Sequence, residues 1–224
     1  MKRRVTTALT TSAPLAALLL LTILAAPGLG GGGGAPGADE VVARVQQRYE
    51  SITTVTASFT QEVFSRGLGS TEVSSGEVTL KKPGKMRWVY REPAGDEITS
   101  DGRTFWLYQA DLGQVVRRPA EEVTSSVATD FLSGVGRLAE EFDVTLDGES
   151  PETYILGLVP TEGLSNIKRL SMEVDKKTFL VVSTTTEDLF GNTTKVTFRD
   201  IATNVPVEDG LFSFVPPAGA VVID

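Results

Sequence analysis

Most of this chain alternates apolar and polar residues in short runs that are separated by turn residues. Alternation with a period of two predicts β-strands that have one apolar face. The clearest turn is Asp101-Gly102, a dipeptide typical of tight hairpins. Because each run follows the last after a short turn, neighbouring strands are expected to pair antiparallel. The sequence therefore predicts an antiparallel meander of about ten strands, in the runs Val55–Val63, Val73–Leu80, Lys85–Arg91, EITS, TFWLYQ, QVVRRP, DVTLD, TYILGLVP, IKRLSMEVD, FLVVSTTTED and TKVTFRDI.

Two segments break this period. Apolar residues recur at helical spacing over about 39–52, which predicts an amphipathic helix with Asp39 as its N-cap. Between the run that ends at Pro119 and the run DVTLD, the insert AEEVTSSVATDFLSGVGRLAEEF shows little alternation. It predicts one or two short helices, which Gly134 and Gly136 weaken by ~1 kcal/mol each.

A sheet of consecutive hairpins curls because its strands twist, so its concave face is apolar and needs a cover. The two helical segments are the available cover. Two interpretations stay open, a permanent core under fixed helices and an openable lid over an apolar hollow. Periodicity by itself favours the permanent core, because apolar stripes usually mark core positions.

The N-terminus has the pattern of a secretory signal peptide. Lys2, Arg3 and Arg4 precede an apolar run from about Leu15 to Ala26, which is shorter than the ~20 residues that span a bilayer. An uncleaved membrane anchor is the alternative. We interpret 1–28 as the signal peptide, with an uncertain cleavage site, 29–38 as a glycine-rich flexible segment, and 39–224 as one domain.

Composition excludes several classes of function. The chain has no cysteine, which rules out disulfides and a lipid-modified cysteine after the signal peptide, so we expect a soluble exported protein. It has no histidine, which rules out Ser-His-Asp and Cys-His catalysis. Without the three basic residues of the signal peptide, 18 basic residues face 29 acidic ones, a net charge of −11. That charge argues against nucleic acid and anionic membrane surfaces as main partners.

The stretch KKPGKMRWVYREP, from Lys81 to Pro93, has two unlike faces. Met86, Trp88 and Tyr90 alternate with cationic residues, so they share one side of a strand. That side either fills an ordinary core or lines a cavity for an apolar ligand.

Several pieces, in order, resemble the outer-membrane lipoprotein carrier protein (LolA) family. They are ASFTQ, G-x-V-x-L-K-K-P, MRWVYREP, SDGRTFWLY, DFL in the insert, and FSFVPPAGAVV at the end, and they extend over nearly all of the mature chain. The resemblance implies a curled, antiparallel, unclosed half-barrel of about ten to eleven strands, covered by a lid of short helices.

The resemblance also implies a function. It is that of a periplasmic, non-enzymatic chaperone that takes lipoproteins from an inner-membrane lipoprotein-releasing ABC transporter to the outer membrane, and to a receptor there if one exists. A monomer without cofactor or metal is expected. The acyl chains would bind in an apolar cavity lined by Val42, Val45, Tyr49, Phe59, Met86, Trp88, Tyr90, Leu107, Phe131, Leu132, Val135, Leu170 and Met172.

Lys82 departs from the family pattern, in which an arginine commonly precedes this proline and bonds backbone carbonyls of the lid. Lysine offers a point donor without the planar fork of arginine. Lys82 is predicted to clasp the lid by bonding carbonyls of the insert. The alternative is an exposed lysine near a turn.

Two other functions compete. One is a receptor domain or envelope sensor of the same fold that reads lipoproteins or acyl groups. The other is a hydrolase that uses carboxylates, for which Glu121, Glu122, Glu140, Glu141 and Asp143 are candidates. Charge runs around helices are usually solvated faces, so the carrier is the favoured interpretation.

Overall fold

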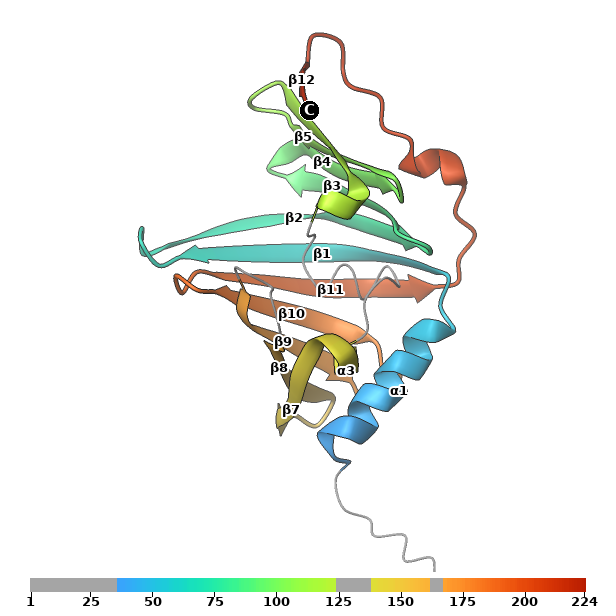
Figure 1. The fold of residues 1–224 in the computed structure, drawn as a ribbon, viewed down its shortest axis with the longest axis vertical. Coiled ribbons are helices and arrows are strands. Elements are labelled where there is room, and N and C mark those ends of the chain that lie inside the picture. Colours follow the sequence, from blue (N-terminus) through green and yellow to red (C-terminus); the bar gives the residue numbers. More distant parts are fainter. Residues whose placement is uncertain (1–35, 124–137, 162–166) are drawn as a thin grey trace, which may run out of the picture. The chain divides into compact units, whose positions relative to one another are not determined.

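The structure is a computed structural model that describes residues 36–123, 138–161 and 167–224 (Figure 1). The predicted signal peptide, most of the glycine-rich segment and most of the central insert lie outside the described residues. Twelve strands occur in the described part. They are β1 (Thr54–Ser65), β2 (Ser70–Lys81), β3 (Lys85–Glu92), β4 (Ala94–Asp101), β5 (Thr104–Gln109), β6 (Gln114–Pro119), β7 (Phe142–Glu149), β8 (Thr153–Pro160), β9 (Ile167–Asp175), β10 (Val181–Asp188), β11 (Thr193–Thr203) and β12 (Val221–Ile223).

All twelve strands belong to one unclosed sheet, in the order β12-β6-β5-β4-β3-β2-β1-β11-β10-β9-β8-β7. Two antiparallel meanders, β1–β6 and β7–β11, are joined at the middle of the sheet by the antiparallel pairing of β1 with β11. The predicted antiparallel half-barrel is confirmed. The sheet gains a strand beyond the expected ten to eleven, because β12 pairs parallel with β6 at one edge. Three residues are too few to show a period, so the sequence did not reveal β12.

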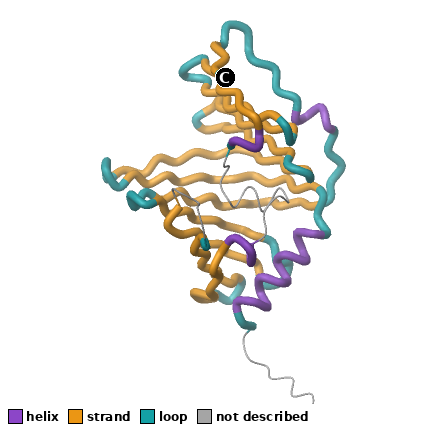
Figure 2. The backbone as a smooth tube through the Cα atoms, viewed as in Figure 1, coloured by secondary structure: helices purple, strands orange, loops and turns teal. Residues whose placement is uncertain are grey.

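Four short helical elements accompany the sheet in the described part of the chain, and Figure 2 draws them in purple. They are α1 (Ala38–Glu50), η1 (Ala120–Glu122), α3 (Leu138–Glu141) and η2 (Asp209–Phe212). The prediction that Asp39 caps the first helix is wrong. Gly37 occupies the N-cap without a side-chain hydrogen bond, and Asp39 lies in the first turn with Glu40. Both carboxylates still favour the helix there, because they complement the positive end of its dipole.

Helix α1 covers the concave face of the sheet beside β7 to β11. Val41 and Val45 on this helix are fully buried in the main hydrophobic core. The hydroxyl of Tyr49 accepts a hydrogen bond of 3.1 Å from the backbone N–H of Val181 in β10. Burial raises the pKa of the Tyr49 hydroxyl, so it stays protonated. The last turn of α1 is thereby tied to the sheet.

A second, smaller apolar cluster lies on the convex face of β3 to β6, under the C-terminal segment. Phe212 is almost fully buried. The ring of Phe214 lies 6.3 Å from that of Trp106 and 6.2 Å from that of Tyr108. Asp209 anchors the start of this segment, since its Oδ1 accepts from Lys81 Nζ at 2.7 Å and from Lys85 Nζ at 3.0 Å.

The sheet is closely packed where β1, β2 and β3 meet at Gly76. A Cβ at this position would lie 2.0 Å from the carbonyl oxygen of Val89 and 3.0 Å from the ring of Phe59. The register between β2 and β3 shifts at the same place. Only glycine fits here, because both neighbours are held by the sheet and the core.

We predict that Gly76→Ala destabilises the domain. Overpacking of this kind costs about 1–3 kcal/mol, which for a domain of this size lowers Tm by roughly 2–12 °C. Thermal unfolding followed by circular dichroism measures the change. Gly67→Ala is the matched control, since a Cβ there meets nothing within 4 Å. Equal melting temperatures for the two variants would contradict the prediction.

Candidate binding site on the concave face

An aromatic cluster forms the centre of the concave face. The ring of Phe59 in β1 lies edge-on to that of Trp88 at 4.9 Å and to that of Tyr90 at 5.2 Å. Phe198 in β11 approaches the Trp88 ring at 6.1 Å. These residues meet because β1 pairs with β2 and β11, and β2 pairs with β3. The cluster therefore extends the apolar surface across the junction of the two meanders.

The predicted two-faced character of β3 is confirmed. Met86 is 8% exposed and Trp88 is 7% exposed, and both belong to the main core. On the other face, Arg87 forms a two-point ion pair with Glu97, at 2.9 Å and 3.0 Å, and Arg91 pairs with Glu77 at 2.7 Å. Bonding to Glu97 raises the pKa of Arg87, so this face stays charged.

The register of β3, β4 and β5 settles which side chains of β5 face the concave side. Ile98 pairs with both Trp88 and Leu107. Directly opposed residues in antiparallel strands share a face, so Leu107 lies on the apolar side, as does Phe105 two residues away. Trp106 lies on the convex side, under Phe214.

A pocket of about 490 Å³ adjoins the aromatic cluster on this face. The hydroxyl of Tyr90 donates to Oε1 of Gln61 at 3.2 Å, and burial raises the pKa of Tyr90. The volume falls within the ~300–1,000 Å³ typical of sites for small ligands. Apolar and acidic side chains both line it, and the complete lining is Gln61, Val63, Glu72, Val73, Ser74, Tyr90, Pro93, Asp96, Ile98, Leu107 and Asp111.

The residues predicted to line a cavity separate into three groups. Two of them, Tyr90 and Leu107, line the pocket. Three of them, Phe131, Leu132 and Val135, lie outside the described residues. The remaining eight are buried together in the main core, and they are Val42, Val45, Tyr49, Phe59, Met86, Trp88, Leu170 and Met172. In this structure those eight pack against one another as a core does.

The sequence did not single out Val63, Val73 or Ile98, which also line the pocket. The sequence did predict a strand at Ile98, because this residue stands in a short run that precedes the hairpin turn at Asp101-Gly102. The structure pairs this strand with β3. The face of Ile98 could be assigned only after the register was known. Asp96 lies in β4 two residues before Ile98 and so shares its face, whereas Asp111 reaches the pocket from the β5–β6 turn, where no alternation predicts a direction.

Lys82 lies at the corner between β2 and β3 and reaches α1. Its Nζ donates a hydrogen bond to the backbone carbonyl of Tyr49, in the last turn of the helix. Burial lowers the pKa of the Lys82 ammonium, and the nearby carboxylate of Glu50 opposes this. The described partner is therefore the first helix. The predicted bond to the insert falls largely on residues outside the described ranges and stays a prediction.

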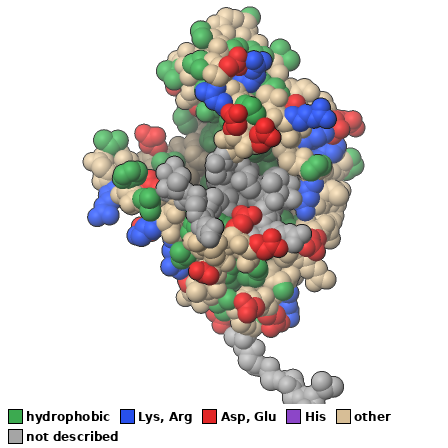
Figure 3. Space-filling view, viewed as in Figure 1, with side chains coloured by type: hydrophobic (Ala, Val, Ile, Leu, Met, Phe, Trp, Pro, Cys, Tyr) green, Lys and Arg blue, Asp and Glu red, His purple; other side chains and the backbone are tan. Residues whose placement is uncertain are grey.

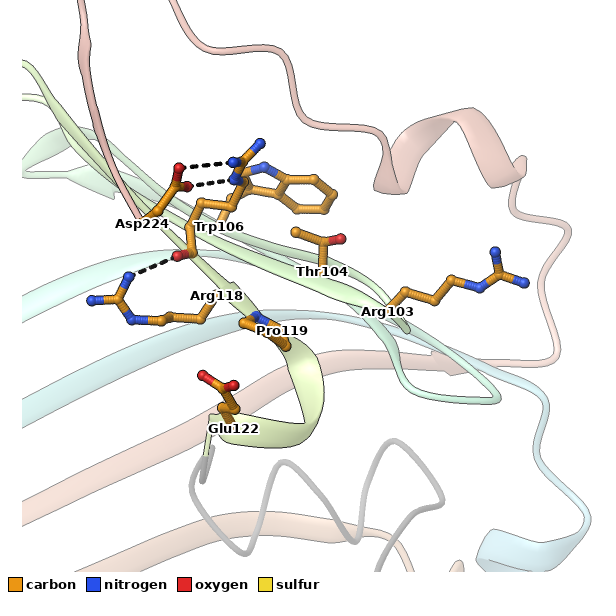
Figure 4. Close-up of a pocket in the computed structure, with 8 residues that line it drawn as sticks. Arg103, Thr104, Trp106, Arg118, Pro119, Glu122 and Asp224 are labelled. Atoms are coloured by element: carbon orange, nitrogen blue, oxygen red, sulfur yellow. Dashed lines mark hydrogen bonds and ion pairs between the residues drawn. The ribbon is translucent and has the colours of Figure 1, made fainter.

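A larger pocket of about 690 Å³ lies elsewhere, near the ends of β5, β6 and β12 (Figure 4). Trp106 and several cationic side chains line it. Arg103 and Arg118 point in opposite directions in Figure 4, and Arg117 is paired with Asp224 at 2.6 Å and 2.8 Å. The cations do not converge on one point, so the concave face remains the candidate site.

Within the described residues, no group of three or more His, Cys, Asp and Glu side chains is placed to hold a metal ion. In the same part of the chain, no helix has both the length and the apolar character needed to cross a membrane.

Comparison with known proteins identifies the family. Residues 50–215 match the family described as outer membrane lipoprotein carrier protein LolA. The outer-membrane lipoprotein carrier protein of Methylococcus capsulatus is 31% identical over 184 residues, which cover 81% of this chain and 86% of that protein. The corresponding protein of Alkalilimnicola ehrlichii is 32% identical over 183 residues, which cover 81% of this chain and 83% of that protein.

Among solved structures, an uncharacterized conserved protein from Thermus thermophilus superposes with a TM-score of 0.54 at 15% identity, over 83% of this chain and 98% of that one. This likeness concerns the fold alone. The family match extends over well more than half of the sequence. The chain therefore belongs to the outer membrane lipoprotein carrier protein LolA family.

Proposed function

We propose that this protein is a carrier that binds the acyl chains of lipoproteins on its concave face and shuttles them from the inner to the outer membrane. The observation that carries the proposal is a continuous apolar face that ends in a pocket, in a chain whose relatives are named lipoprotein carriers. The signal peptide at 1–28 would deliver the domain at 39–224 to the periplasm, with 29–38 as a flexible segment.

The physics of the cargo explains why a carrier is needed. Each buried methylene contributes ~0.8 kcal/mol, so an acyl chain of about 15 methylenes resists transfer into water by on the order of 10 kcal/mol. A protein that hides the chain from water removes most of this cost without catalysing any reaction. The concave face offers apolar contacts of this kind, and we assign it no enzymatic role.

Loading requires the apolar face to become accessible. The pocket beside Tyr90 and Leu107 is the entry, and Met86 and Trp88 line the deeper part of the hollow. Both of these side chains are buried in the closed arrangement. We propose that acyl chains displace what covers them, with α1 and the insert around Phe131, Leu132 and Val135 acting as the lid.

Lys82 holds this arrangement closed in our proposal. Its bond to the carbonyl of Tyr49 joins the β2–β3 corner to the end of α1. Hydrogen bonds from charged donors contribute about 1.5–3 kcal/mol net. That free energy is enough to favour the closed position of α1, but it is small compared with the stability of the whole domain.

The partners follow from the same role. Cargo would be received from an inner-membrane lipoprotein-releasing ABC transporter and passed to an outer-membrane receptor, if the cell has one. We expect the carrier to act as a monomer.

The first prediction concerns cargo. The protein purified from a periplasm that contains a co-expressed lipoprotein should carry it as a complex that native mass spectrometry resolves. The control cargo has its lipid-attachment cysteine replaced, and it should not bind because the acyl chains are missing. Equal binding of the two cargoes would exclude acyl recognition.

The second prediction concerns the face that meets the lipid. In a Trp106→Phe background, a fatty acid with a quencher on its chain should reduce the fluorescence of Trp88, which lies on the concave face. In a Trp88→Phe background the same fatty acid should leave Trp106 unchanged, because that ring packs against Phe214 on the convex face. Quenching of Trp106 without quenching of Trp88 would place the lipid on the convex face and contradict the prediction.

The third prediction concerns the clasp. Lys82→Leu removes the donor to the Tyr49 carbonyl, so amide hydrogen exchange in the last turn of α1 should rise about tenfold. Transfer of a lipoprotein between vesicle fractions should also change, since the closed state is weakened. Lys82→Arg keeps a cationic donor and should retain slow exchange. If Lys82→Leu exchanges and transfers like the wild type, Lys82 is only a surface lysine.

A further inference from the structure

Three turns of the sheet share an unusual feature. In the β1–β2, β5–β6 and β10–β11 turns, a large apolar residue directly precedes a glycine with positive φ. The pairs are Leu68-Gly69, Leu112-Gly113 and Phe190-Gly191, and the glycine φ values are 64°, 58° and 83°. The apolar side chains are 78%, 67% and 80% exposed, and Leu189 beside Phe190 is 61% exposed. We call Leu68, Leu112, Leu189 and Phe190 the apolar rim.

All four residues of the apolar rim lie at the same end of the sheet. The strand registers place the turns 66–69, 110–113 and 189–192 at the end where β1, β5 and β10 finish. Figure 1 shows the three turns on the left side of the sheet, and Figure 3 shows hydrophobic side chains on the projecting part there. The β1–β2 and β10–β11 turns are neighbours, since the N–H of Arg66 donates to Oδ1 of Asn192 at 3.0 Å.

The turns at the opposite end are polar, as turns usually are. They contain Asp101–Arg103, Ser150–Glu152 and Lys176–Thr178. In the described part of the chain, no large apolar side chain is exposed in those turns. The apolar rim is therefore a property of one end of the sheet.

The turns of the apolar rim are well fixed. The N–H of each glycine closes its turn, on Ser65 O at 2.8 Å, on Ala110 O at 3.1 Å and on Asp188 O at 3.1 Å. The carboxylate of Asp188 also accepts from the backbone N–H groups of Phe190 and Asn192, both at 2.8 Å. Because the backbone is already ordered, placing these side chains in an apolar environment loses little conformational freedom.

The apolar rim adjoins the pocket on the concave face. Val63 and Val73, which flank the β1–β2 turn, and Asp111 next to Leu112 all line that pocket. A surface that binds the apolar rim would therefore lie next to the opening of the pocket.

From this geometry we propose that the apolar rim is a membrane-contact surface that inserts its side chains shallowly into a phospholipid bilayer. The side chains of the apolar rim project separately from three turns, and a fluid apolar phase can surround each of them. A protein partner of ordinary interface size would need one contiguous surface of about 800 Å². The inference extends the proposed carrier function, because insertion would bring the pocket entry to the lipid from which an acyl chain comes or to which it goes.

The net charge of the mature chain determines which lipid surfaces the apolar rim can contact. The mature chain has a net charge of −11, so an anionic surface would repel it. Arg66 beside Leu68 makes no ion pair in the described residues and can meet a headgroup phosphate. Binding should therefore rest on apolar insertion, and it should occur on zwitterionic vesicles with weak dependence on salt.

The test uses the cysteine-free chain without any lipoprotein. Wild-type protein should float with phosphatidylcholine vesicles, and the double variant Leu68→Ser/Phe190→Ser should lose at least tenfold in partition coefficient, since each side chain would lose its burial. Val215→Ser is the matched control, because Val215 is 80% exposed like Phe190 but lies on the C-terminal segment. It should float like the wild type.

A second measurement locates the contact. A polarity-sensitive dye on Leu68→Cys or Phe190→Cys should shift its emission to the blue when vesicles are added, and the same dye on Val215→Cys should not. The inference is overturned if wild type does not float, if the double variant floats equally, or if only vesicles with phosphatidylglycerol bind it in low salt. Quenching of Trp88 by a free fatty acid needs no bilayer, so failure here leaves the carrier proposal standing.

Discussion

The pairing of β1 with β11 is the constraint on which the rest of this structure depends. It runs from Val55 opposite Thr203 to Phe64 opposite Thr193, and it joins two meanders that are each built from local hairpins. Among the described strands, no other pairing links the two meanders. Through the pairing of β1 with β11, Phe59 and Phe198 come together and the aromatic cluster continues across the junction.

The pairing also gives the sheet two faces with different covers. On the concave side, α1 packs beside β7 to β11 and the main core extends from there across β1, β2 and β3, while the pocket opens over β1 to β5. On the convex side, the C-terminal segment packs Phe212 and Phe214 against β3 to β6. The two tryptophans consequently lie in different environments, one facing the candidate lipid site and one behind it.

The two ends of the sheet differ as much as the two faces. One end carries Lys82, which holds α1 through the Tyr49 carbonyl, together with polar turns. The other end carries the pocket and the apolar rim. In the proposed carrier, this division keeps the lysine that would hold the cover closed away from the route by which an apolar chain would enter. The separation of Lys82 from the pocket is a consequence of strand direction, since successive turns alternate between the ends.

The sequence by itself determined the strands, their antiparallel order and the two faces of β3, because alternation and short turns are local properties of the chain. It also determined that no cysteine or histidine chemistry is possible, and its motifs pointed to the family. Tertiary structure alone decided the pairing of β1 with β11, the parallel β12, and the partner of Lys82, since these join residues far apart in sequence. It also decided that Leu107 faces the pocket while Trp106 does not, because the face of each side chain follows from register, and register is fixed only when the strands meet.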